Sequence, residues 1–196
     1  MNNILEISFD KEVDCSKEVA FWNYWDHEHL DVIHKGYKES DILYDSNNFI
    51  FRVDKVKIPV VPFLTSMSPI FTVQHDENTL LTYAIQFGVI SKTTITINSV
   101  ARSKCKINMN YKFYLNGWRK ILRPILKWLI PIWNERAFLE DLPVKLRRQK
   151  IVDLNFKDFV GLPDRIDERF YSGEIRFKPP VKRPKNSRRD RHPLKK

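Results

Sequence analysis

The residues that could do chemistry are concentrated in one short stretch, residues 23–34. It holds three of the five histidines of the chain, together with four carboxylate or amide side chains. Imidazole and carboxylate groups suit divalent transition metals, and two histidines with one carboxylate suit non-haem iron(II). The stretch therefore predicts a metal site if these side chains converge on one point, and a polar helix face if they do not.

This stretch belongs to a longer segment with helical spacing. Apolar side chains recur every three or four positions over residues 17–34, Ser16 is a suitable N-cap, and Gly36 is a natural end. A straight helix would place Asp26 and His29 on the apolar stripe. An unpaired polar group there costs roughly 1–3 kcal/mol. These two side chains therefore need a partner, which could be each other, a water molecule or an ion.

The other histidine of interest is His34, five residues beyond His29. On an ideal helix, five residues correspond to roughly 140° of rotation. The two imidazoles can therefore meet only if the helix ends or bends near Gly36. The remaining polar residues of the stretch are interpreted as facing solvent: His27, Glu28 and Asp31.

Residues 37–115 change to a β-type pattern, and residues 4–13 read as a preceding first strand. Runs rich in β-branched and aromatic residues are separated by turn signals at 45–48, 76–78 and 99–104, and His75 is interpreted as a turn residue. Strands joined by such short turns pair in an antiparallel meander. Prolines 59 and 62 predict an interruption of regular pairing.

Helix returns near residue 118. Within residues 118–133 an apolar stripe is interleaved with basic residues, and Pro124 and Pro131 predict a kink or break. A further amphipathic helix is predicted over about 139–159. The 118–133 segment has two interpretations. It packs on the sheet, which we favour, or it lies in a bilayer interface, as helices with tryptophan, aliphatic and basic residues do.

The order of elements is one strand, one helix, about six meandering strands and a long C-terminal helix. It predicts an α+β protein in which an antiparallel sheet curls around that last helix. Over nearly all of residues 1–160 this order resembles the helix-grip fold of the START and Bet v 1-like (SRPBCC) superfamily. The resemblance implies a cavity for an apolar ligand. It implies no particular activity, because fold alone does not define a function.

A motif makes the resemblance more specific. The pattern Asn23-x2-Asp26-x2-His29-x4-His34 resembles that of the catalytic domain of Rieske-type ring-hydroxylating oxygenases, itself a helix-grip domain. The resemblance implies that His29 and His34 bind mononuclear Fe(II) and that Asp26 supports them. It also implies a third ligand on the C-terminal helix, where residues 137–149 point to Asp141.

The chain departs from that family in two respects. Trp22 stands where an acidic residue usually precedes the motif, and neither cysteine begins a Cys-x-His pair, so the sequence shows no Rieske cluster. We therefore expect electrons from a separate protein. Alternatives also stay open at the site itself. Glu140 could be the third ligand, Asp141 could be an N-cap ahead of Pro143, and both histidines could be polar residues of a metal-free protein.

Charge separates the chain into two parts. Of a net charge of +10, residues 174–196 carry ten Lys/Arg against two acidic residues. We interpret residues 161–196 as a basic, proline-rich, disordered tail. The tail could meet anionic lipid or an acidic electron-donor protein. Nucleic acid is disfavoured because no aromatic residue follows Phe177.

The two cysteines are far apart and predict no disulfide. The sequence lacks a recognisable signal peptide and an apolar run long enough to span a membrane. We expect a cytoplasmic protein with a membrane-associated surface as an option.

The leading hypothesis is an iron oxygenase acting on an apolar ring-bearing or lipid-like substrate. The alternative is a START-like protein that binds or transports a hydrophobic ligand or lipid without catalysis.

Overall fold

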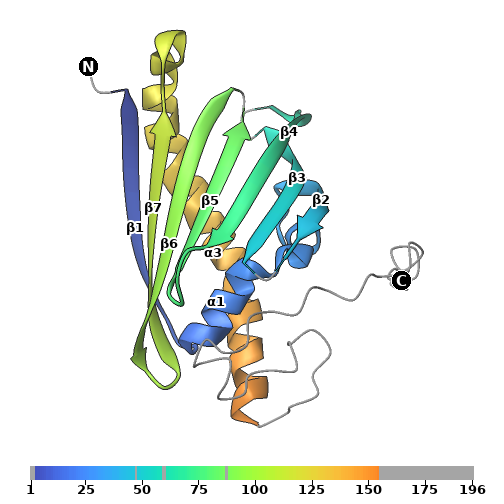
Figure 1. Cartoon of the computed structure of the whole chain (residues 1–196), viewed down its shortest axis with the longest axis vertical. Coiled ribbons are helices and arrows are strands. Elements are labelled where there is room, and N and C mark those ends of the chain that lie inside the picture. The colour runs from blue at the N-terminus through green and yellow to red at the C-terminus, as the bar shows by residue number, and fades with distance from the viewer. Residues whose placement is uncertain (1–2, 47, 59–60, 87, 155–196) are drawn as a thin grey trace, which may run out of the picture.

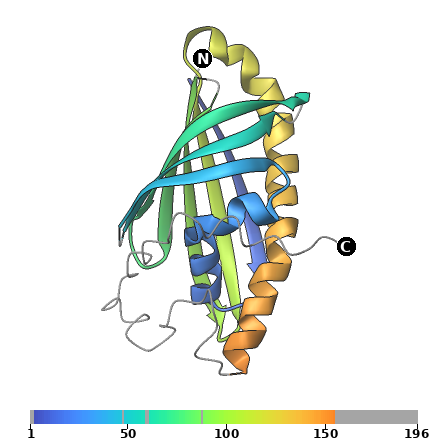
Figure 2. The same cartoon turned by 90° about the vertical axis from the view of Figure 1, so that its right-hand side faces the viewer.

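The computed structural model describes residues 3–46, 48–58, 61–86 and 88–154 (Figure 1). The predicted tail, residues 161–196, and the end of the helix predicted to reach residue 159 lie outside this range. Within it, the chain forms one antiparallel sheet and a set of helices that pack on one side of it (Figures 1 and 2).

The sheet has seven strands in the order β1-β7-β6-β5-β4-β3-β2. Every neighbouring pair is antiparallel, so β2 to β7 form the predicted meander and the first strand returns to pair with the last. The strands are β1 (Ile4–Val13), β2 (Tyr37–Asp45), β3 (Phe49–Ile58), β4 (Val61–Gln74), β5 (Thr79–Gln86), β6 (Val89–Ala101) and β7 (Lys104–Tyr114). The predicted interruption near the two prolines is confirmed by a register shift between Lys57 and Ile58.

The first helix begins as the sequence predicts but ends earlier. In α1 (Lys17–Trp25), the Ser16 side chain accepts a hydrogen bond from the Val19 amide, as an N-cap does. The prediction that residues 17 to about 34 form one continuous helix is wrong. Asp26 takes an extended backbone conformation, and the chain continues as a short 3-10 turn, η1 (His27–His29), and then α2 (Leu30–Ile33).

The last helix is longer than predicted. After the 3-10 segment η2 (Gly117–Leu122), α3 runs unbroken from Arg123 to Asp153 and includes Pro131 and Pro143 in its interior. Of the kink or break predicted at Pro124 and Pro131, no break occurs at Pro131, and Pro124 lies in the first turn of α3. An interior proline costs about 3 kcal/mol, but packing of a whole helix face on the sheet outweighs such a local cost. The buried face consists of Ile130, Asn134, Phe138, Asp141, Lys145 and Gln149.

The core lies between the sheet and the helices. Figure 2 shows α3 running along one side of the sheet, with α1 and α2 between them. Val19 and Ala20 of α1 and Phe138 of α3 pack with sheet residues that include Ile97 and Ile107. Cys15 and Cys105 are buried in this cluster as free thiols, and their Sγ atoms lie 4.0 Å apart although 90 residues separate them in the sequence.

The 118–133 segment packs on the sheet through only one of its sides. Leu122, Leu126, Ile130 and Trp133 lie against a second apolar cluster that includes Leu5, Phe113 and Leu115. The favoured interpretation, packing on the sheet, holds for this side alone. The opposite side of the same segment is exposed: Trp118, Ile121, Ile125, Trp128 and Ile132. None of the described helices is long and apolar enough to cross a bilayer.

Candidate metal centre

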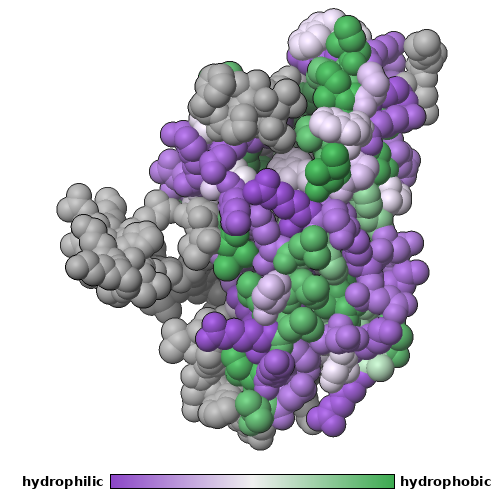
Figure 3. All heavy atoms as spheres, turned by 180° about the vertical axis from the view of Figure 1, so that it is seen from behind, coloured by the Kyte–Doolittle hydropathy of each residue, from purple (hydrophilic) through white to green (hydrophobic). Residues whose placement is uncertain are grey.

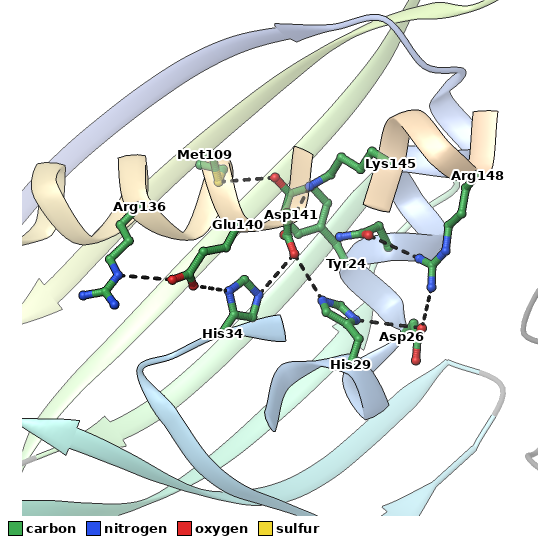
Figure 4. Close-up of polar contacts among 11 residues, drawn as sticks. Tyr24, Asp26, His29, His34, Met109, Arg136, Glu140, Asp141, Lys145 and Arg148 are labelled. Atoms are coloured by element: carbon green, nitrogen blue, oxygen red, sulfur yellow. Dashed lines mark hydrogen bonds and ion pairs between the residues drawn. The ribbon is translucent and has the colours of Figure 1, made fainter. Parts of the chain in front are cut away.

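Three side chains from two distant parts of the chain meet beneath α3 (Figure 4). The Nε2 atoms of His29 and His34 lie 3.3 and 3.1 Å from the same oxygen, Oδ1 of Asp141. One ligand atom from each residue can be chosen so that all three lie within 4.8 Å of one another. The structure thus brings together the two histidines and the aspartate that the sequence singled out.

The interrupted helix makes this convergence possible. His29 ends η1, and His34 follows the last residue of the short helix α2 with an extended backbone. The change of direction between Trp25 and His34 turns both imidazoles toward α3, which a straight helix could not do. Asp141 is in the interior of α3 on its buried face, so its alternative role as an N-cap is wrong.

The donor set is suited to a cation. At metal–ligand bonds of about 2.0–2.2 Å, neighbouring ligand atoms lie roughly 3 Å apart, close to the two distances observed. His29 Nε2 and Asp141 Oδ1 are also buried and, within the described residues, lack a hydrogen bond of normal geometry. A buried polar atom with no partner at all costs about 1–3 kcal/mol, and the close His–Asp141 contacts offset only part of such a cost. An ion between them would satisfy both, so the residues fit a metal.

Each histidine also has a carboxylate near its other ring nitrogen, within hydrogen-bond distance at His34 and farther away at His29. Glu140 Oε2 lies 3.0 Å from Nδ1 of His34, and Asp26 Oδ2 lies 3.8 Å from Nδ1 of His29. Glu140 therefore supports His34 and does not face the point where the two Nε2 atoms meet, which favours Asp141 over Glu140 as the third ligand. Carboxylates in this position fix the ring orientation and the tautomer of a metal-binding histidine.

Two arginines of α3 hold these supporting carboxylates. Arg148 donates to Asp26 Oδ2 at 2.9 Å and to the side-chain oxygen of Asn23 at 3.2 Å. Arg136 donates to Glu140 at 3.2 Å. Charged and polar pairs therefore surround the three candidate ligands. Asn23 and Asp26 of the motif belong to these pairs, and His29 belongs to the candidate ligands.

Lys145 is an unexpected member of the site. Its side chain is 0% exposed, and its Nζ donates to Asp141 Oδ2 at 3.1 Å (Figure 4). It also lies over the ring of Tyr24, 4.5 Å from its centre. Because Lys145 engages Oδ2, Asp141 presents a single oxygen, Oδ1, to the histidines. The carboxylate is thereby oriented as a ligand through one oxygen.

The electrostatics favour an ionised aspartate beside a protonated histidine when no metal is bound. Burial opposes the charge on Asp141, but contacts with His29, His34 and Lys145 outweigh it and hold the pKa of Asp141 below its ordinary value. Burial likewise opposes the charge on His34, but Asp141 and Glu140 raise the pKa of His34 above its ordinary value. Burial lowers the pKa of Lys145, and the Asp141 carboxylate opposes that effect.

His27 is buried, contrary to the expectation that it faces solvent. Only 7% of it is exposed, and its Nδ1 contacts the guanidinium of Arg52, which in turn binds Asp54. Burial, together with the nearby Arg52, lowers the pKa of His27 well below its ordinary value. His27 therefore belongs to a separate buried polar cluster. The side chains of Glu28 and Asp31, for which the same expectation was made, lie outside the described part of the structure.

An open surface hollow of about 630 Å³ lies along the outer side of α3. Pro131, Ile132 and Leu139 supply apolar walls, and the lining also includes Glu140. Glu140 also contacts His34, so only the Glu140 side chain would separate a molecule in the hollow from this candidate metal-binding histidine.

Sequence reasoning missed the cations of the site. Lys145 and Arg148 lie four and seven residues beyond Asp141, so they share its side of α3. A lysine at helical spacing on a stripe that also contains Phe138 was the available signal, since a buried lysine needs a charged partner.

No protein-family model matches this sequence, and no curated protein matches it. Among solved structures, the ZhuI aromatase/cyclase from Streptomyces sp. R1128 is 8% identical, with a TM-score of 0.59 over 76% of this chain and 94% of that one. A START superfamily protein from Mycobacterium smegmatis is 14% identical, with a TM-score of 0.52 over 75% of this chain and 98% of that one.

A dicamba monooxygenase bound to dicamba is 13% identical, with a TM-score of 0.57. The match covers 87% of this chain but 57% of the monooxygenase, so the likeness concerns part of that protein. At these identities the likeness concerns architecture. The seven-stranded antiparallel sheet and its long C-terminal helix, together with these neighbours, show that the chain has the helix-grip fold of START and Bet v 1-like proteins.

Proposed function

We propose that this protein is a mononuclear non-haem iron oxygenase acting on an apolar, ring-bearing or lipid-like substrate. The observation that carries the proposal is the meeting of His29, His34 and Asp141. Within the part of the chain that the structure describes, His29 Nε2 and Asp141 Oδ1 are buried there without a hydrogen bond of normal geometry. Two histidines and one carboxylate with open positions are the ligand set of non-haem iron(II) oxygenases. The dicamba monooxygenase among the structural neighbours is consistent with this chemistry.

The residues of the site have separable tasks in this proposal. Nε2 of each histidine and Oδ1 of Asp141 would hold iron, which supplies the redox chemistry with dioxygen that side chains lack. Glu140 keeps the proton of His34 on Nδ1, so that the lone pair of Nε2 points inward, and Asp26 is placed to do the same for His29. Lys145 restrains the second oxygen of Asp141 and leaves more of the coordination sphere open.

The substrate and the electrons would come from outside the site. The hollow beside Glu140 has apolar walls that would favour an apolar molecule. Both cysteines are buried in the core and begin no Cys-x-His pair, so electrons would come from a separate donor protein. The acidic surface of such a donor would complement the basic residues 174–196.

Metal analysis of protein purified without oxygen tests the proposal. We expect about one iron per chain in the wild type, and loss of iron in His29→Ala and His34→Ala. His75→Ala is the matched control, because His75 is an exposed histidine in the turn before β5. Nitric oxide, a dioxygen surrogate, should give a high-spin electron paramagnetic resonance signal with the iron form. Wild-type protein that binds no iron on reconstitution contradicts the proposal.

The second candidate is binding of a hydrophobic ligand without catalysis. The helix-grip fold, its START neighbour and the apolar hollow favour it. Mass spectrometry of native protein would then find an apolar molecule at a defined stoichiometry, and its retention would be unchanged in His29→Ala and His34→Ala. A ligand that depends on both histidines supports the iron site instead.

A further inference from the structure

One side of the segment from η2 to the middle of α3 is apolar and open to solvent. Residues at spacings of three and four lie on it, and they are largely exposed: Trp118 68%, Ile121 71%, Ile125 47%, Trp128 63% and Ile132 52%. We call these five residues the outer apolar face. Seen from behind, apolar and near-neutral spheres gather at the upper end of the molecule, where α3 begins (Figure 3).

This face is additional to the one that the fold needs. The inner side of the same segment already packs on β1 and β7 through Leu122, Leu126 and Ile130. A helix that only packs on a sheet has one apolar stripe and a polar outer side. Here both sides are apolar, and nothing in the described part of the chain covers the outer one. Contiguous exposed apolar surface of this kind marks an interaction site.

Charge around the face identifies the partner. Lys120 and Lys127 are exposed between its apolar residues, and Arg119 lies over the ring of Trp118. The sequence has no acidic residue at all over positions 78–134, which comprise β5, β6, β7, η2 and the start of α3. The partner must therefore be apolar and anionic at once, as the interface of an anionic bilayer is.

We propose that the outer apolar face binds the surface of an anionic membrane. Tryptophan and isoleucine side chains would enter the headgroup boundary, and the lysines would meet lipid phosphates. A second copy of the chain would bring the same positive charge to the contact, and the tail residues 174–196 are basic as well. Repulsion between like charges therefore opposes a second copy of the chain, and equally the tail, as the occupant of this face. An anionic lipid surface complements its charge.

The proposal is independent of iron, but it has a geometric link to the candidate centre. Ile132 belongs both to the outer apolar face and to the lining of the hollow that reaches Glu140. An apolar molecule that leaves the bilayer at this face would therefore meet the mouth of the hollow first. The same surface would anchor the protein and deliver a lipid-derived ligand.

Flotation of the full-length protein with vesicles tests the proposal. We expect binding to phosphatidylcholine vesicles that contain 25% phosphatidylserine and little binding to pure phosphatidylcholine. Each basic residue near an anionic surface contributes about fivefold in affinity, so Lys120→Glu with Lys127→Glu should weaken binding by more than tenfold. Trp118→Ser with Trp128→Ser should weaken it at least as much.

The matched control removes exposed apolar side chains elsewhere. Leu43→Ser with Tyr44→Ser changes two exposed residues of β2 and should bind vesicles as the wild type does. All variants alter exposed positions, so circular dichroism should show an unchanged fold. Binding that survives both the tryptophan and the lysine substitutions overturns the proposal and places attachment elsewhere. A dimer that the tryptophan variant dissociates, without vesicle binding in the wild type, also overturns it.

Discussion

Metal affinity should rise steeply with pH below neutrality, because His34 must lose a proton before it can be a ligand. In the metal-free protein, Asp141 and Glu140 raise the pKa of His34 above its ordinary value of 6.5, so its imidazole is charged at pH 5.5–6.5. Metal binds the neutral ring and displaces that proton. Asp141 stays ionised over this range because its own pKa is lowered, so it adds no proton.

The magnitude follows from the number of protons released. One displaced proton changes the metal affinity tenfold per pH unit, which is about 1.4 kcal/mol. At a fixed excess of metal, the stabilisation over the metal-free protein grows by up to that amount per pH unit. For a folded part of about 150 residues, this corresponds to roughly 3–6 °C per pH unit. The stability of the metal-free protein changes with pH in the opposite direction. The contribution of protonated His34 to its free energy of unfolding is present below pH 6.5 and is lost as pH rises through the raised pKa of His34.

Calorimetric melting with and without Fe(II), in oxygen-free buffers from pH 5.5 to 6.5, measures this difference. His75→Ala should behave as the wild type, since that histidine is exposed and distant from the site. His34→Ala should lose the metal-induced shift. A shift that is independent of pH, or equal in wild type and His34→Ala, would refute the assignment of His34 as a ligand.

Three further changes probe the surroundings of the site. Lys145→Met leaves the Asp141 carboxylate without its buried cation, so the metal-free protein should lose about 3–5 kcal/mol in urea unfolding. An unchanged midpoint contradicts this role. Asp26→Asn removes the carboxylate beside His29 and should lower metal affinity about 10–100-fold in competition with a chelating dye, without abolishing binding. Ile107→Ala, at a fully buried core position, should cost about 2–5 kcal/mol and leave metal affinity unchanged.

The sheet was predictable from the sequence because its determinants are local. Alternating side chains and short turns at 45–48, 76–78 and 99–104 define a meander without knowledge of any distant contact. Ser16 likewise acts as a cap through a hydrogen bond within its own turn. The helix-grip architecture followed from the order of these elements, and the structural neighbours confirm it.

The errors occurred where distant residues decide the local conformation. Asp26 was placed within a continuous helix, but its carboxylate is held by Arg148, and the helix ends there. Pro131 was expected to kink or break a helix, and packing keeps α3 continuous through it. Asp141 could be proposed only through the family resemblance, because its position opposite the histidines depends on how α3 crosses the sheet. No spacing rule links residues so far apart.

The candidate centre also has a topological consequence. It connects His29 to Asp141 and so closes a loop of roughly 110 residues that contains β2 to β7. A bound ion there would be a removable cross-link between α3 and the start of the chain. A covalent cross-link of that span is worth about 4–5 kcal/mol in chain entropy. The two buried cysteines form no such bond. The availability of metal would then set the free energy needed to separate α3 from the rest of the protein.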